Sequence, residues 1–552
     1  MKIRWTALSV FAAALCAAPV SAATPIDPRE ADEQIQILTM ALKDQPTSAS
    51  TMMRLAQVLH AIGREGEAAQ WESLALAIDA GVRQTPANQP TDGGCTPNTG
   101  PDIIVGDLNG IGVYTSTPVN GFHGFSIGTT SCNLGDQNVQ WISNTNQHPV
   151  IGQNMYRISG AQGRTRIEQI GLSWLKHGFT ALTQNLCCTC NGSGGSVLGV
   201  GCSDPYDAGL NGSQSNLGPR FEVNASTGVF AWPASMRTNT SSDPTYKHCR
   251  VAASDMNPAS FTNPIWIAEG QYISSHDAQF KGLNTLYGQP VVGGPLANGL
   301  NNASYRRFTF NYNSTNGAVS GVAFSGSTVR EKPAILAWKD FDPAVTIVNA
   351  DVPDEGGPGL VGRFIVGYLV TNNGNGTWDY EYAIHNLNSH RSARTFTVPF
   401  RGDGVQITNI GFHDVSYHSG DGNGSTFTNQ INFDGTDWTP VVTPNGSIGW
   451  STQTIAQNIN ANALRWGTLY NFRFTANVAP VNANATIGLF RPGAQADPVA
   501  PITGPGCRWN GDYNNDGAVD FADINIVLGA FGSPYTFTEL NIVLGNFGQT
   551  CN

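Results

Sequence analysis

Cysteine and histidine are more concentrated in residues 174–206 than anywhere else in the central part of this sequence. The groups there that form covalent or metal bonds are His177, Cys187, Cys188, Cys190 and Cys202. In a reducing cell, thiolates with a nearby imidazole are ligands that suit zinc or copper. In an oxidising compartment, the same cysteines favour disulfide bonds. The central part therefore contains either a metal site or a disulfide-braced segment.

The pairing of these cysteines is open. Three more cysteines belong to the central part, namely Cys95, Cys132 and Cys249. Together they make an odd number, so one thiol is left free, is a ligand or bonds elsewhere.

His177 is predicted at the end of a helix. Ile167, Ile170, Trp174 and Leu175 recur at helical spacing, and Gly178 suits a left-handed residue that ends the helix. The helix dipole at this end favours a protonated imidazole, and the position directs a neutral imidazole toward the cysteines. A purely structural histidine is the alternative.

Two histidines mark a second candidate site in residues 411–422. His413 and His418 are five residues apart, so a regular strand would place them on opposite faces. The apolar pattern changes phase between Phe412 and Val415, and a one-residue bulge there would bring both imidazoles to one outer face. With Asp414, they would then form a zinc, copper or catalytic site. Polar residues at the edge of a sandwich are the alternative.

Carboxyl groups of the body are candidates for the acid/base pair of glycoside cleavage, and the sequence selects no pair among them. Seven of them are Asp340, Asp342, Asp351, Asp354, Glu355, Asp379 and Glu381. Glycoside cleavage needs an acid and a base or nucleophile at a set separation, which sequence spacing does not reveal. The motifs of serine hydrolases, zinc proteases and phosphate-binding loops are absent from the sequence.

The most specific motif is a twelve-residue loop at residues 512–523. Its oxygen donors fall at the spacing of an EF-hand calcium loop, at Asp512, Asn514, Asp516, Ala518 through its backbone carbonyl, Asp520 and Asp523. Gly517 permits the sharp turn at the sixth position. The sequence therefore predicts a Ca²⁺ site.

This segment resembles the calcium-binding repeat of type I dockerins, in which Asp commonly closes the loop. A second copy of the following helix, residues 537–548, matches residues 521–532 at a constant offset of sixteen, and the second calcium loop is missing. The resemblance implies a cohesin-like or other cell-surface protein as partner. Cys507 and Cys551 stand at the two ends of this module, so we expect a disulfide that joins them.

The elements that position these groups follow from composition. Charged residues are 12% of the 552-residue chain, Gly numbers 63 and the net charge is −11. Such a chain favours short strands and polar turns, and its charge argues against nucleic acid as a partner. Residues 1–23 read as a secretory signal peptide, with Lys2 and Arg4 before a short apolar run. No later segment is long and apolar enough for a membrane span.

The expected fold is mainly β, with small helical parts at both ends. Residues 28–83 read as helical, including a tetratricopeptide-like pair, and residues 84–102 as a linker. The body divides into a turn-rich, disulfide-braced region, 103–300, and an antiparallel sandwich, 301–492. A second linker, 493–506, leads to the dockerin-like module, 507–552. Predicted strands include residues 334–338 and residues 378–384, where alternation indicates one buried face.

The whole chain is also similar to large secreted bacterial proteins without an assigned activity, through residues 174–206 and 463–474. That likeness implies no catalytic residues. The leading hypothesis is a secreted, calcium-binding multidomain protein that acts on extracellular polysaccharide as a glycan-binding or surface-assembly component. The alternative is a secreted enzyme, either a hydrolase that uses carboxylates or an oxidative metal enzyme.

Overall fold

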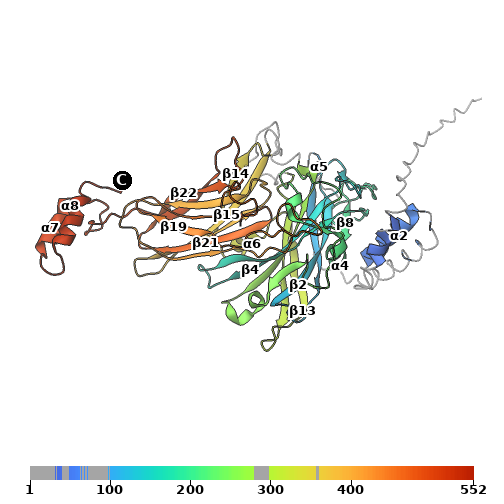
Figure 1. Ribbon diagram of the computed structural model, residues 1–552, viewed down its shortest axis with the longest axis horizontal. Helices are drawn as coiled ribbons and strands as arrows, with labels where there is room; N and C mark the ends of the chain where they lie inside the picture. The colour runs from blue at the N-terminus through green and yellow to red at the C-terminus, as the bar shows by residue number, and fades with distance from the viewer. Residues whose placement is uncertain are drawn as a thin grey trace, which may run out of the picture.

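A computed structural model describes the following residues: 31–39 without 33, 49–62, 64, 68, 71, 97–278 without 99, 298–355 and 360–551. The molecule is elongated, with strands in its middle (Figure 1). Helix α2 (Ala49–Ala61) lies at one end, and helices α7 (Phe521–Gly529) and α8 (Phe537–Gly545) lie at the other. The predicted fold class, mainly β with small helical parts, is confirmed.

Two antiparallel sheets form the N-terminal half of the body. Sheet 1 contains β1 (Ile103–Val113), β2 (Phe122–Asn133), β8 (Ser203–Tyr206) and β10 (Cys249–Ala252). Sheet 2 contains β4 (Val150–Ser159), β5 (Arg166–Leu172), β6 (Leu175–His177), β9 (Leu217–Gly218), β11 (Ile265–Ile273), β12 (Ala303–Tyr312) and β13 (Val319–Val329). A small ribbon pairs β3 (Val139–Gln140) with β7 (Val197–Leu198). Short helices α4 (Ala208–Asn211) and α5 (Ser275–Ala278) join these strands.

Two more antiparallel sheets form the C-terminal half. Sheet 3 contains β14 (Thr346–Pro353), β15 (Val361–Asn372), β16 (Trp378–Asn386), β18 (Ile407–His413) and β21 (Thr468–Ala476). Sheet 4 contains β17 (Ala393–Pro399), β19 (Thr439–Thr443), β20 (Ser447–Ser451), β22 (Pro480–Leu489) and β23 (Val499–Pro505). Helix α6 (Ile335–Phe341) stands between the two halves of the chain.

The four sheets stack in order, and an apolar layer fills each gap. Side chains alternate along every strand, so β16 sends Tyr382 toward sheet 4 and Ala383 toward sheet 2. The middle layer joins residues such as Ile267 of sheet 2 to Leu469 of sheet 3. The prediction of one buried face for residues 378–384 is therefore wrong for the later part of β16, where both faces are buried.

Two elements differ from their sequence-based predictions. Residues 166–172 and 175–177 form strands β5 and β6, and the predicted helix that ends at Gly178 is absent. Conversely, the predicted strand at 334–338 is largely the helix α6. Both segments are short apolar runs, in which periodicity alone does not distinguish a buried strand from a buried helix turn.

Two predicted boundaries also move. Strands β12 and β13 lie beyond residue 300, yet they complete sheet 2 through β11, so the second sandwich starts later than residue 301. Residues 493–506 include β23, which pairs with β22 along its full length. This segment is therefore the last strand of the body as well as the connection to the C-terminal module.

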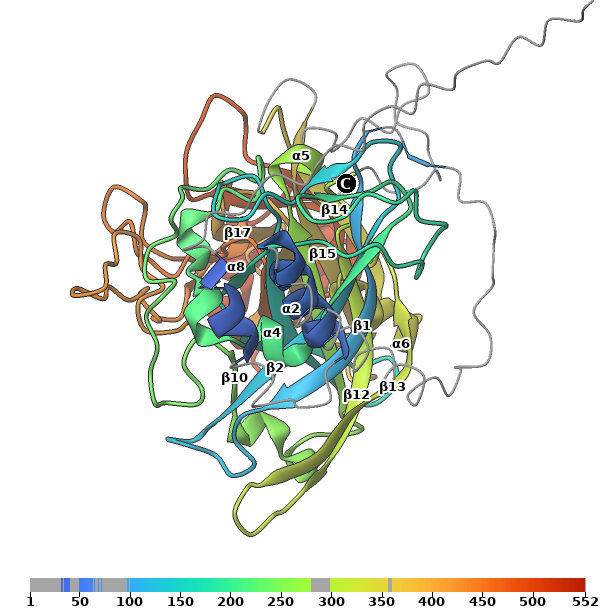
Figure 2. The ribbon, with the colours of Figure 1, turned by 90° about the vertical axis from the view of Figure 1, so that its right-hand side faces the viewer.

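The N-terminal helical part packs on sheet 1. Leu38, Met52 and Leu55 belong to the apolar layer of sheets 1 and 2. Arg54 of α2 reaches Asp204 of β8 with an N–O distance of 2.5 Å, and both side chains are fully buried. Figure 2 shows α2 against α4 at this end. The signal peptide and part of the predicted tetratricopeptide-like pair lie outside the described residues. Among the helices that the structure describes, none is long and apolar enough to cross a membrane.

Candidate functional site

The cysteines of the central part are structural. Disulfides join Cys132 to Cys187 and Cys190 to Cys202, and Cys188 is also disulfide-bonded. The first bond fastens the loop before β8 to the end of β2, and the second closes this loop on itself. Bonded sulfurs have no thiolate to offer a metal. The disulfide interpretation is therefore confirmed, and these disulfides fit an oxidising compartment. Among the described cysteines, Cys249 is free and buried in sheet 1, where burial raises the pKa of its thiol.

His177 lies on strand β6 and meets another histidine. Its Nδ1 is 2.9 Å from Nε2 of His148, and the rings of Phe230 and Trp232 surround the pair. Burial lowers the pKa of His177, and its neighbour His148 lowers it further. Burial likewise lowers the pKa of His148 to about 3. Both imidazoles are therefore neutral at pH 7, contrary to the protonated form that the predicted helix would favour.

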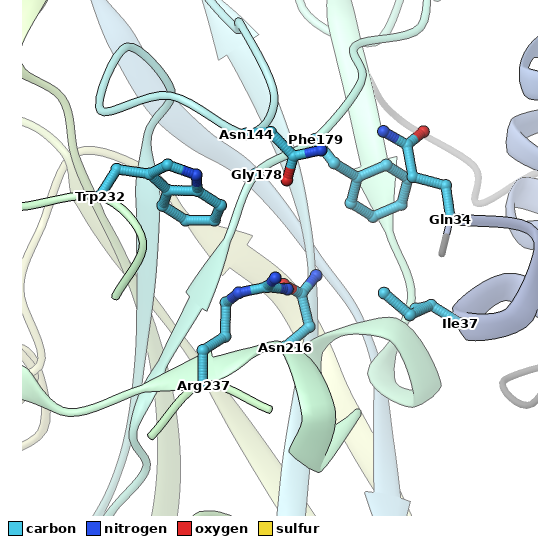
Figure 3. Close-up of a pocket in the computed structure, with 8 residues that line it drawn as sticks. All are labelled: Gln34, Ile37, Asn144, Gly178, Phe179, Asn216, Trp232 and Arg237. Carbon is cyan, nitrogen blue, oxygen red and sulfur yellow. The ribbon is translucent and has the colours of Figure 1, made fainter. Parts of the chain in front are cut away.

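A small pocket opens beside this histidine pair (Figure 3). Its walls are Gln34, Ile37, Asn144, Gly178, Phe179, Asn216, Trp232 and Arg237. Arg237 donates to Oδ1 of Asn216 at 3.0 Å, and its guanidinium lies 5.0 Å from the Trp232 ring centroid. Gln34 and Ile37 come from the N-terminal helical part and face the body across the pocket. The described part of the lining is basic and aromatic, and no carboxyl group is among its described residues.

The predicted bulge in residues 411–422 does not form as expected. Strand β18 ends at His413, and its register shift lies earlier, between Thr408 and Gly411. Phe412, Val415 and Tyr417 still pack into the layer between sheets 3 and 4, as predicted. Ile410, by contrast, is 36% exposed.

The two histidines of this segment have different neighbours. The charge of Glu168 on β5 acts on His413, whereas Nε2 of His418 lies 2.9 Å from the carbonyl oxygen of Leu172 at the other end of β5. In the parts of the chain that the structure describes, no three His, Cys, Asp or Glu side chains are placed to hold a metal. The structure therefore does not bring His413, His418 and Asp414 together as one metal site.

The same segment lines two neighbouring hollows. The first, here called the outer cavity, has a volume of ≈ 290 Å³ and is lined by Arg250, Asp414, Val415, Ser416, Tyr417, His418, Ser419, Asn432, Phe433 and Gly435. The second, here called the arginine pocket, is lined by Arg220, Phe221, Val223, His390, Ser392, Tyr417, Asp421, Phe433, Arg465, Trp466, Thr468 and Arg491. Tyr417 and Phe433 belong to both, and their rings meet edge-on with centroids 4.9 Å apart.

Each hollow has a carboxyl group with a raised pKa. Burial raises the pKa of Asp414 to about 6, although its Oδ2 accepts a hydrogen bond from Asn462. Burial raises the pKa of Asp421 to about 7, although its Oδ2 accepts the amide of His418 at 2.6 Å. A carboxyl that titrates near neutral pH can both give and take a proton, as a general acid or base must. Among the two, the sequence drew attention only to Asp414.

The carboxyls singled out from the sequence have structural partners instead. Asp351 forms a two-pronged ion pair with Arg363, and Glu381 pairs with Arg166 at 2.7 Å. Asp342 accepts three hydrogen bonds from residues 162–165. The others, Asp340, Asp354, Glu355 and Asp379, likewise lie outside the linings of the two hollows.

In the C-terminal loop, residues 512–523, carboxylates accept hydrogen bonds from backbone amides of the loop itself. Asp512 accepts the amides of Asp516 and Gly517, and Gly517 has a φ of +89°, which favours glycine. Asp523 is fully buried and accepts three amides, including that of Tyr513 at 2.7 Å. These contacts turn the first and last carboxylates of the loop toward its own backbone. The predicted donors are all oxygens, which is the ligand chemistry that Ca²⁺ prefers.

The disulfide between Cys507 and Cys551 is present, with Cα atoms 5.5 Å apart. The amide of Cys551 also donates to the carbonyl of Gly517, so the chain end closes over the loop. Helices α7 and α8 begin with matching capping boxes, Asp520 with Asp523 and Thr536 with Glu539.

The module exposes much of its apolar surface. Its small core contains Trp509, Val519, Val527 and Val543, with Ile524 and Leu540 partly buried. Six large apolar side chains instead face solvent: Phe521, Leu528, Phe531, Phe537, Leu544 and Phe547. They form three pairs at the offset of sixteen residues. Phe521, Leu528 and Leu544 are thus at the surface of the module.

A comparison of the chain with models of known families and with characterised proteins finds no match.

Proposed function

We propose that this chain is a secreted, calcium-binding multidomain protein. Its body binds extracellular polysaccharide, and its C-terminal module attaches it to a protein at the cell surface. The observation that carries the proposal is the apolar face of α7 and α8, in which Phe521 and Phe537 are 71% and 70% exposed. Large exposed apolar patches of soluble proteins mark surfaces that bind partners.

The form of this apolar face favours a protein partner. The two helices present equivalent residues, and the ring pairs Phe521–Phe547 and Phe531–Phe537 both meet edge-on at 5.0 Å. Rigid aromatic anchors are the residues that dominate stable protein interfaces. The partner that fits is a protein with a flat apolar face, and the resemblance to dockerins suggests a cohesin-like module.

Calcium would hold this face in place. The loop at 512–523 precedes α7 directly, and its last carboxylate, Asp523, lies within the first turn of that helix. Four carboxylates crowded in one loop repel each other unless a cation neutralises them. We infer that Ca²⁺ binds Asp512, Asn514, Asp516, Ala518, Asp520 and Asp523 and so fixes α7 against α8.

The outer cavity supports glycan binding by the body. Its volume of ≈ 290 Å³ suits a single sugar ring, at the lower end of small-molecule sites. Asp414, Asn432 and Arg250 offer hydrogen bonds to hydroxyl groups, and Tyr417 and Phe433 offer aromatic faces to the C–H side of a sugar. The raised pKa of Asp414 also supports the second candidate, hydrolysis of the bound polysaccharide.

Binding assays with the full chain test the docking proposal. The wild-type chain and the Phe521→Ala/Phe537→Ala variant are compared on immobilised type I cohesin modules with calcium present. Phe427→Ala is the matched control, because Phe427 is 61% exposed on the body. We expect the double variant to lose binding and the control to retain it. Absence of wild-type binding, or binding that survives the double substitution, contradicts docking by this face.

A glycan array tests the body. We expect binding to at least one polysaccharide class and loss of that binding in Ser416→Trp, which fills the outer cavity. Release of reducing ends, abolished in Asp414→Asn, would establish hydrolysis, whereas binding without release establishes a binding module.

A further inference from the structure

The arginine pocket lies where the two halves of the body meet. Arg220, Phe221 and Val223 come from one turn of the first half, and the other lining residues come from one end of the second sandwich. Asp421 follows β18, Arg465 precedes β21 and Arg491 follows β22. Four distant segments of the chain thus supply the charged groups of one small pocket.

Positive charge exceeds negative charge in this lining. Three guanidinium groups face one carboxyl group, that of Asp421. The hydrogen bonds described for these arginines go to neutral acceptors. Arg220 donates to Asn154 and to three backbone carbonyls. Arg491 donates to Ser392 and to the carbonyl of His390. In the described part of the chain, none of the three forms an ion pair with a carboxylate.

Arg465 is a buried arginine of this pocket with an unsatisfied donor. It is 7% exposed, its guanidinium stacks 3.7 Å from the Phe433 ring centroid, and its Nη2 donates to the carbonyls of Ile459 and Ala461. Its Nε has no hydrogen-bond partner within the described residues, and neither has Oδ1 of Asp421. A buried donor without a partner is unfavourable, more so when it is charged, so a ligand atom that accepts its hydrogen bond is favoured here.

The like charges also act on each other. Burial, and after it the charge of Arg465, lower the pKa of Arg491 to about 10. Burial lowers the pKa of His390 to about 4, with Arg491 next in effect, so this imidazole adds no charge at pH 7. Glu355 accepts a hydrogen bond from the backbone amide of His390, and its negative charge offsets part of the positive charge of Arg491. An added anion would therefore be attracted by Arg491 and Arg465 together.

Aromatic rings complete the pocket. Phe221, Phe433 and Trp466 line it, and the Trp466 indole is fixed by a hydrogen bond to the carbonyl of Val223. Guanidinium groups beside aromatic faces suit a ligand that joins a planar oxyanion to an apolar ring face. A hexuronate has both, a carboxylate on C5 and a ring with C–H faces.

We propose that the arginine pocket binds the carboxylate of a hexuronate unit, with Arg465 and Arg491 as its anchors and the Tyr417–Phe433 pair between this carboxylate and the outer cavity. The inference rests on the proposed glycan binding and gives its ligand class, an acidic polysaccharide. Hexuronates and sulfated sugars both carry an oxyanion, and the test distinguishes these two ligand classes.

Titration calorimetry on the full chain at pH 7 tests the proposed carboxylate site by measuring the affinity for glucuronate, glucose and glucose 6-sulfate. We expect glucuronate to bind at least tenfold more tightly than the other two. Arg491→Gln should weaken glucuronate at least tenfold, and Asp421→Asn, which removes a competing carboxylate, should strengthen it. Arg307→Gln is the matched control, since Arg307 lies exposed on β12 away from the pocket.

Each outcome decides between the proposals. Equal binding of glucuronate and glucose, or unchanged binding in both pocket variants, overturns the carboxylate site. Preference for glucose 6-sulfate overturns the assignment to a carboxylate. If neutral polysaccharide still binds on the glycan array, the proposed function survives that failure; if no glycan binds, both fall. A thermal melt of each variant shows whether it is folded.

Discussion

The ring of Phe521 meets the ring of Phe547 edge-on with centroids 5.0 Å apart, and Phe531 meets Phe537 in the same arrangement. Each pair joins the start of one helical repeat to the end of the other. The two contacts therefore join the two helical repeats at the surface, whereas Val527 and Val543 pack in the core of the module.

Substitutions on the two sides of these helices should change the free energy of unfolding by different amounts. Because Phe521 and Phe537 are mostly exposed, we expect their replacement by alanine to change the free energy of unfolding by no more than about 1 kcal/mol. Val543→Ala removes a fully buried side chain and should cost about 1 to 3 kcal/mol. Hydrogen exchange of the module in the full chain measures both. A larger loss in the phenylalanine variant would show that these rings form the core.

Calcium and the disulfide should stabilise the module independently. Chelation leaves the carboxylates of the loop unneutralised, and reduction of the bond between Cys507 and Cys551 frees a chain segment of 44 residues. In the chain-entropy model, that bond contributes roughly 4 kcal/mol. We expect chelator to increase hydrogen exchange in residues 507–551, and chelator with reductant to increase it further. Exchange that is unchanged by chelator contradicts the calcium site. Asp136, which lies outside this module, provides an amide for internal reference.

The buried pair of Arg54 and Asp204 should hold the N-terminal helical part on the body. The Arg54 guanidinium also lies 3.6 Å from the Tyr206 ring centroid. Arg54→Met leaves the Asp204 carboxylate buried without its partner, which should cost about 3 to 5 kcal/mol in urea unfolding. The double variant with Asp204→Asn should recover most of this loss, since no buried charge remains. A double variant as unstable as the single one would mean that packing, and not charge, is what α2 loses.

Stability should depend on pH through Asp421. Its pKa is about 7 in the folded protein and about 3.9 in an unfolded chain, so the folded state keeps a proton that the unfolded state releases. The associated stability is fully present below about pH 4 and is lost as pH rises through 7. The charges of Arg220 and Arg465 and the amide of His418 already limit the shift.

Asp421→Asn removes this dependence. Relative to the wild type, we expect the variant to gain roughly 2 to 4 kcal/mol between pH 4 and pH 8, measured by urea unfolding at each pH. Asp414, Asp204 and Glu381 also have raised pKa values, but they are common to both proteins and cancel in the difference. A constant difference across this pH range would mean that Asp421 titrates normally.

Local patterns were reliable where neighbours in sequence decide the structure. The spacing of Asp512 to Asp523 predicted a compact loop before a helix, and the ends of the module predicted the bond between Cys507 and Cys551. Alternation also identified the inward side chains Tyr380 and Tyr382 of β16. The calcium ion and the partner stay predictions.

Other outcomes depended on groups far apart in the chain. Residues 166–177 became strands because β4 supplies their hydrogen bonds, and nothing within the segment encodes that partner. Helix α6 is held through Trp338, whose indole N–H donates a hydrogen bond to the hydroxyl of Thr165 in the first half. For short apolar runs, the position in the stack of sheets decides between helix and strand.

The sequence by itself determined the mainly β composition, the alternation along β16, the repeat at an offset of sixteen and the closure of the C-terminal module. Only the tertiary structure placed Arg220, Asp421, Arg465 and Arg491 around one pocket. It also turned Phe521 outward, away from the core. The reason is physical: propensity and spacing act within a few residues, whereas burial, and with it the pKa of Asp421, depends on which distant segments pack together.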